Sequence, residues 1–165
     1  TATFTIDGGA PVVRVITVPA HSRGTFIAHD STAGVGIGKA FGVFITSTAP
    51  VVVLMHHPAS EQDLSGNRWF EKAPHICRVA ERRELRRVLE ESGKVAAVFN
   101  GHAHWNHVDL IRGIPYLTLQ SLIENLDDDA PGRPASAFAV VDLDSKRLCV
   151  RVDGAEAARY QFERG

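Results

Sequence analysis

The 165-residue sequence predicts an α/β fold formed as a single domain over residues 1–165, a length at which about 70% of the unfolded surface is buried. Two apolar runs, "PVVVLMHHP" (50–58) and "KVAAVFNGH" (94–102), are typical of strands buried on both faces of a sheet. An amphipathic helix at residues 78–93 separates them. This strand–helix–strand order favours two neighbouring parallel strands and is the basis of the predicted class.

The segment before the first apolar run predicts short strands and loop. Residues 3–18 hold two β-branched runs parted by Asp7-Gly8-Gly9, which predicts two strands joined by a turn. Residues 19–48 are rich in glycine and small side chains, so we expect mainly loop, with one strand at 41–46. The polar, proline-flanked stretch 59–74 predicts a surface loop.

The predicted helix has an apolar side and a charged side. The apolar residues on one side are Val79, Leu85, Val88 and Leu89, and Gly93 supplies the C-terminal stop. The arginines of the helix are interleaved with glutamates, which predicts an exposed face of salt bridges; they are Arg82, Arg83, Arg86 and Arg87. After the second apolar run we expect short strands at 107–112 and 115–119 and a terminal hairpin turning near 144–146.

Composition excludes several classes of function. A formal net charge of −1 with 22% charged residues offers no broad attraction to nucleic acid. Cys77 and Cys149 lack a Cys-x-x-Cys spacing, so they predict free thiols. No apolar run approaches the roughly 20 residues of a membrane helix. The first residues lack the features of a signal peptide, so we expect a soluble chain, with the cytoplasm slightly favoured.

Histidines follow both apolar runs. His56 and His57 end the first, and His102 and His104 end the second. Because ligands gather outside the carboxyl ends of parallel strands, we expect these rings to converge. In an extended segment His102 and His104 would share a face, with Gly101 relieving backbone crowding. Neutral imidazoles are common ligands of zinc, iron and manganese, so the cluster predicts a metal site.

Three other histidines have no partner in the sequence. They are His21, His29 and His75, and we expect them to be structural.

A "HHP" strand end followed by "GHAH" resembles the last two motifs of the calcineurin-like metallophosphoesterases. The resemblance covers about residues 51–120 and implies a layered β sandwich flanked by helices. It also implies hydrolysis of phosphomonoesters or phosphodiesters at two metal ions (Mn, Fe or Zn) lying about 3.5 to 4 Å apart. Carried over by residue, His56 and His102 would bind one metal and His104 the other. His57, the catalytic candidate, would either face the substrate phosphate or simply pack beside the ligand. Asn106 and His107 are candidates for the rim only.

The earlier motifs of that family are absent. No Asp-x-His and no Gly-Asp occurs between residues 1 and 50, and the Gly-Asn at Gly66-Asn67 is followed by arginine instead of histidine. The chain therefore resembles the carboxyl-terminal portion of a phosphoesterase domain, and the fold is expected to be incomplete. A second chain or a missing segment would have to supply the remaining Asp, His and Asn ligands.

Three functions remain open. The first is a metal-dependent phosphoesterase whose remaining ligands come from elsewhere. The second is a catalytically inactive or regulatory module that binds a partner or a single metal. The third is an enzyme unrelated to phosphate that uses His56, His102 and His104 as a three-histidine zinc site with one open position.

Overall fold

The computed structural model describes residues 2–6, 12–15, 41–45, 49–122 and 135–164. The chain divides into two compact units, residues 1–49 and 50–165, where length alone predicted one domain. The first unit contains a three-stranded antiparallel sheet in the order β2-β1-β3, formed by β1 (Ala2–Ile6), β2 (Val12–Arg14) and β3 (Phe41–Ile45). The strands predicted in this region are confirmed. The loop predicted between them lies largely outside the described residues.

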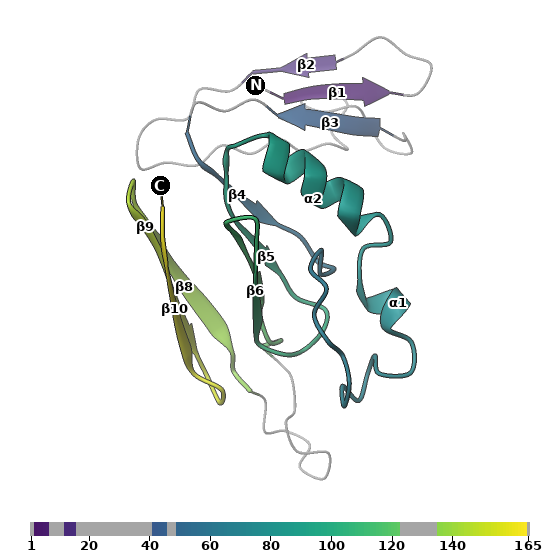
Figure 1. The fold of residues 1–165 in the computed structure, drawn as a ribbon, viewed down its shortest axis with the longest axis vertical. Coiled ribbons are helices and arrows are strands. Elements are labelled where there is room, and N and C mark those ends of the chain that lie inside the picture. The colour runs from purple at the N-terminus through teal and green to yellow at the C-terminus, as the bar shows by residue number, and fades with distance from the viewer. Residues whose placement is uncertain (1, 7–11, 16–40, 46–48, 123–134, 165) are drawn as a thin grey trace. The chain divides into compact units, whose positions relative to one another are not determined.

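The second unit holds a four-stranded sheet in the order β4-β5-β7-β6 (Figure 1). Its strands are β4 (Val51–Leu54), β5 (Val95–Asn100), β6 (His107–Ile111) and β7 (Ile114–Thr118). β4, β5 and β7 run parallel, and β6 pairs antiparallel with β7. The predicted pair of neighbouring parallel strands is therefore confirmed, and β4 and β5 end at the same edge of the sheet.

A second sheet of three antiparallel strands follows in the order β10-β9-β8. Its strands are β8 (Phe138–Leu143), β9 (Arg147–Asp153) and β10 (Ala158–Glu163). The predicted hairpin is confirmed, because the Asp144 carboxylate accepts hydrogen bonds from the backbone N–H groups of Lys146 and Arg147 at 2.7 and 2.9 Å. β10 was not predicted, although its residues alternate between half-buried and exposed, which is the pattern of a strand with one face against a core.

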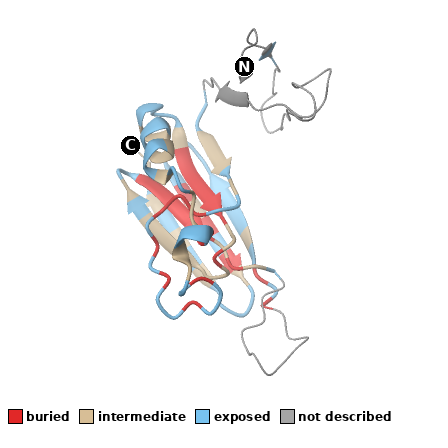
Figure 2. Ribbon diagram, turned by 90° about the vertical axis from the view of Figure 1, so that its right-hand side faces the viewer, coloured by how far each residue is buried: buried red, intermediate tan, exposed pale blue. Residues whose placement is uncertain are grey.

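In the second unit, the four-stranded sheet, the sheet of β8, β9 and β10, and one helix form three layers. Ala97, Phe99 and Leu117 of the four-stranded sheet pack against Leu148 and Val150 of β9, which closes the sandwich. The opposite face of the same sheet carries a second core. Figure 2 shows the most deeply buried strands at the centre of this unit. The layered arrangement predicted from the sequence is thereby confirmed for the second unit.

The second core lies under α2 (Arg82–Glu91), while the short α1 (Pro74–Cys77) precedes it. Leu85 and Leu89 pack against this core, as the helical pattern predicted. Val79, however, precedes the helix, and Val88 is 56% exposed. A helix of ten residues presents only a narrow stripe of side chains to the sheet. Leu85 and Leu89, four residues apart, lie on this stripe and reach the core, whereas Val88 points away from it.

The stretch 59–74 was predicted to be a surface loop, and residues 59–73 do form a loop, but part of it is buried. Its buried residues are Ala59, Ser60, Gln62, Leu64, Asn67 and Phe70. Arg82 and Arg86 of α2 reach across to the Glu61 carboxylate at 2.9 and 3.0 Å, so these two arginines hold the loop instead of joining the exposed helix face. Of the predicted surface pairs, Arg87 bridges Glu84 and Glu91 at 2.9 and 3.0 Å.

Candidate metal centre

The carboxyl ends of β4 and β5 are joined by backbone hydrogen bonds. The Met55 N–H donates to the Phe99 carbonyl at 2.9 Å, and the Gly101 N–H donates to the His56 carbonyl at 3.0 Å. These bonds continue the parallel pairing beyond the last residues of the strands. They place the segment that begins at His56 directly beside the one that contains His102.

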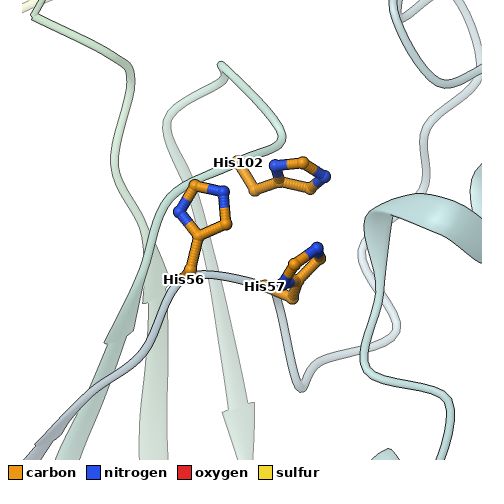
Figure 3. Close-up of side chains that lie close together, drawn as sticks. All are labelled: His56, His57 and His102. Atoms are coloured by element: carbon orange, nitrogen blue, oxygen red, sulfur yellow. The ribbon is translucent and has the colours of Figure 1, made fainter.

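Three imidazoles meet at this edge. His56, His57 and His102 each offer a ring nitrogen, and these nitrogens lie within 4.8 Å of one another. The ring centroids of His56 and His57 are 4.9 Å apart, and the His102 centroid lies 4.6 and 4.2 Å from them. Figure 3 shows the rings arriving from two neighbouring strand ends. The convergence expected from parallel strand ends is present.

The three-histidine group suits a single metal ion. Burial lowers the pKa of His102, and the positive charges that His57 and His56 can carry lower it further, so the neutral ring that binds a metal is favoured. Nitrogens around tetrahedral zinc lie about 3.3 Å apart, given bonds of 2.0 to 2.1 Å. The nitrogens lie up to 4.8 Å apart, so the rings must rotate toward one another to bind one ion. The group includes no carboxylate, so within the described residues it does not suit a bridged pair of ions.

His104 lies outside this group. Its ring centroid is 5.6 Å from that of Trp69 and 6.4 Å from that of Phe70. The separation has a backbone cause, because His102 and His104 both have left-handed φ angles, 66° and 60°. The extended segment assumed from the sequence would have put both rings on one face, whereas this tight turn directs them apart.

Left-handed backbone at a non-glycine residue is uncommon and costs roughly 1 to 2 kcal/mol. Gly101 was expected to relieve the crowding at this turn, and that expectation is wrong. A Cβ atom placed at Gly101 would meet only the Leu119 carbonyl, at 3.9 Å, which is an ordinary contact. The two histidines carry the unusual conformation themselves, and strain of this kind collects at functional sites.

Asn67 holds the turn in place, a role that the sequence did not reveal. The side chain is fully buried, and its amide Nδ2 donates to the Ala103 carbonyl, between His102 and His104, at 2.8 Å. Its Oδ1 accepts the backbone N–H groups of Trp69 and Phe70, both at 3.0 Å. An asparagine that bonds the backbone two residues later is a known turn signal, which could have predicted the local turn but not the bond to Ala103.

A chain of buried polar groups lies beside this loop. The Asn100 amide donates to the Thr118 hydroxyl at 2.6 Å, and that hydroxyl donates to the Gln62 amide oxygen at 2.9 Å. All three residues are at most 4% exposed, so each lost bond would leave a buried polar atom without a partner. This chain ties β5, β7 and the loop together just before Gly101.

The two rim candidates have structural contacts. Asn106 donates to the Glu156 carbonyl at 3.1 Å and accepts the Gln120 N–H at 3.0 Å. His107 begins β6, with its Nε2 3.1 Å from the Asp109 carboxylate. Of the histidines expected to be structural, His75 lies exposed in α1, and His21 and His29 fall outside the described residues.

Solved structures with a similar fold include phosphatases. A dimetal phosphatase from Danio rerio matches 70% of this chain, and the match covers 32% of the phosphatase, with a TM-score of 0.53 and 20% identity. A predicted phosphoesterase from Streptococcus pneumoniae TIGR4 matches 51% of this chain and 47% of its own length, with a TM-score of 0.35 and 19% identity. A mutant of Vps29 from Entamoeba histolytica matches 50% of this chain and 47% of its own length, with a TM-score of 0.34 and 14% identity.

No family model matches the sequence, and no curated protein matches it. Among the described residues, no helix is long and apolar enough to cross a membrane. The fold comparison rests on the dimetal phosphatase, of which this chain spans about a third. The chain therefore shares part of its fold with a dimetal phosphatase, in agreement with the kind of fold that its two histidine motifs predicted.

Proposed function

We propose that this chain contributes a metal-binding part of a phosphoesterase site that hydrolyses phosphomonoesters or phosphodiesters. The observation that carries the proposal is the meeting of His56, His57 and His102 where β4 and β5 end, within a fold shared with a dimetal phosphatase. Ligands of open α/β sheets bind at this edge. An all-imidazole donor set favours zinc or iron over manganese, which prefers oxygen ligands.

In this proposal His57 and His104 exchange the roles that the resemblance implied. His57 belongs to the group of nitrogens that can hold the ion, while His104 stands outside it, beside Trp69. A divalent ion bound here supplies Lewis acidity toward the phosphoryl oxygens and acidifies a nearby water. Hydrolysis joins the water oxygen to phosphorus, releases a proton of that water to solvent and breaks the ester P–O bond, and we assign to His104 the transfer of a proton to the departing oxygen.

The same observations support one alternative, an inactive or regulatory module that binds a single metal. What favours it is the lack of a carboxylate in the three-histidine group, because hydrolysis at a bridged pair of ions needs more ligands than this group provides. Under the phosphoesterase proposal a second chain or a further segment supplies those ligands.

Two measurements on the purified chain test the proposal. The first is titration calorimetry with Zn²⁺ and with Mn²⁺, and the second is hydrolysis of bis(p-nitrophenyl) phosphate in the same metals. We expect saturable Zn²⁺ binding, with His102→Ala weakening it more than about 100-fold, since loss of outer partners alone costs 10- to 100-fold. His75→Ala is the matched control and keeps the affinity.

The outcomes separate the functions. Metal binding with turnover of the diester supports the phosphoesterase. Metal binding without turnover, also with Mn²⁺, means that this chain alone is inactive and that hydrolysis requires the ligands supplied from elsewhere. Metal-dependent activity confined to carboxylic esters indicates the three-histidine enzyme unrelated to phosphate. Absence of binding, or equal binding by the His102→Ala and His75→Ala variants, would contradict the phosphoesterase, the single-metal module and the three-histidine enzyme, and would leave only a module that binds a partner.

A further inference from the structure

Trp69 presents a large aromatic surface beside the histidines. It is 53% exposed, and its ring centroid lies 5.6 Å from that of His104 with the planes at 59°. The neighbouring Phe70 is 8% exposed, and its ring lies 4.8 Å from that of His102. One ring of the pair is thus packed under the three-histidine group, while the other stands at its border and faces solvent.

The position of Trp69 is fixed by buried hydrogen bonds. The Asn67 side chain accepts a hydrogen bond from the backbone N–H of Trp69 and donates one to the Ala103 carbonyl, which lies between His102 and His104. The backbone that carries the exposed indole is therefore anchored to the turn that carries the histidines. A fixed backbone reduces the conformational entropy that is lost when an aromatic side chain on it binds a ligand.

Arg68 adds a cation to this surface. Its guanidinium carbon lies 4.8 Å from the Trp69 ring centroid, within the range of a cation–π contact. Half of Trp69 remains exposed with Arg68 in that position. A planar guanidinium next to an indole is a surface on which another planar ring can stack, because aromatic rings and guanidinium groups both bind the face of a π system.

From this arrangement we infer that Arg68 and Trp69 form a stacking platform for a planar aromatic ring in the organic part of the phosphate ester. The inference rests on the proposed function, since it requires the phosphate to bind at the three-histidine group. The platform lies beside His104, two residues after His102 in the chain, so it selects esters whose ring reaches that side of the three-histidine group. Phosphate esters with saturated organic parts gain nothing from it.

Phosphonates test the inference, because their P–C bond resists hydrolysis. Phenylphosphonate and phenylethylphosphonate differ in reach, and each has a cyclohexyl counterpart of similar size that cannot stack. We expect calorimetry on the Zn²⁺-loaded protein to show tighter binding of at least one aromatic ligand than of its counterpart. Trp69→Ala should remove that preference, weakening the aromatic ligand about 5- to 150-fold, the range for loss of one stacking contact.

Variants separate stacking from folding. Trp69→Phe keeps a ring and should retain most of the preference, whereas Val88→Ala, which also truncates an exposed apolar side chain, should leave it unchanged. Zn²⁺ affinity, measured alone, should be the same in Trp69→Ala and the parent protein. Equal binding of aromatic and cyclohexyl ligands, or a preference that survives Trp69→Ala, overturns the platform while the proposed function stands. Failure of every phosphonate to bind the Zn²⁺-loaded protein overturns both.

Discussion

The two strand ends that carry histidines differ in how they present them. After β4, His56 and His57 both direct ring nitrogens into the three-histidine group. After β5, only His102 does so, while His104 lies against Trp69. The difference comes from the backbone, because the second pair occupies a tight left-handed turn held by Asn67. Spacing along the chain places histidines at an edge, but the local φ angles decide which of them can share an ion.

Removing the two candidates for the third ligand, His57 and His104, one at a time should give the largest difference in Zn²⁺ affinity. If the arrangement of rings sets the ligands, His57→Ala weakens Zn²⁺ binding more than about 100-fold, close to the loss in His102→Ala. His104→Ala then leaves the affinity within a few-fold of the parent protein. Calorimetric titration of the three variants measures this. The reverse order, with His104→Ala the more damaging, would restore the ligand set that the family resemblance implied.

Removing the anchor of the turn should have the next largest effect. Asn67→Ala leaves the Ala103 carbonyl and the Trp69 N–H buried or half-buried without their partners, so we expect a loss of about 1 to 3 kcal/mol in the free energy of unfolding. Urea denaturation followed by circular dichroism measures it. Asn106→Ala, whose bonds lie at more exposed positions, should cost less. A smaller loss in Asn67→Ala than in Asn106→Ala would argue that the turn forms without this anchor.

The strained backbone predicts a smaller difference between two substitutions at one site. At φ 60°, glycine is tolerated better than alanine, so His104→Gly should be more stable than His104→Ala by about 1 kcal/mol. Both variants lack the imidazole, which removes the side chain from the comparison. Thermal and urea denaturation should agree on the order. If His104→Ala were the more stable, the turn would not have the left-handed geometry described above.

The pH dependence of the metal-free protein gives the smallest expected effect. The folded pKa of His102 lies below its ordinary value of 6.5, mainly through burial, so the unfolded chain binds a proton more readily than the folded chain. The contribution of His102 to the free energy of unfolding is therefore fully present above pH 6.5 and is lost as the pH falls toward the folded pKa of this residue. Urea midpoints across this range measure it, and His102→Gln should flatten the slope. A slope identical in both proteins would mean that another group causes it.

Much of the fold followed from patterns along the chain. The runs at 50–58 and 94–102 predicted neighbouring parallel strands, and the structure confirms this pairing. The prediction that both strands are buried on both faces holds for β5 and is wrong for β4, which is an edge strand with half-buried and exposed residues. The meeting of the histidines followed from the shared edge of those strands. The burial of the loop at 59–73 could not be predicted, since half of its buried residues are polar and one of them, Gln62, accepts a hydrogen bond from the distant Thr118.

Details of the site depended on features without a local signal. Nothing in "GHAH" specifies left-handed φ angles, and the bond that favours them comes from Asn67, 36 residues away along the chain. Arg82 and Arg86 follow the charge pattern of an exposed face, yet tertiary contacts draw them to Glu61. The ligand set taken from the sequence remains a prediction for the His57 and His104 variants to decide.

The double engagement of Asn67 has a thermodynamic consequence. One amide group bonds the turn between His102 and His104 and the backbone of Trp69, so a ligand that stiffens either side lowers the entropy that the other side must lose. Occupancy of the three-histidine group and of the stacking platform should then be cooperative. Because such coupling is reciprocal, an aromatic ligand would raise the affinity for the ion by the same factor by which the ion raises the affinity for the ligand.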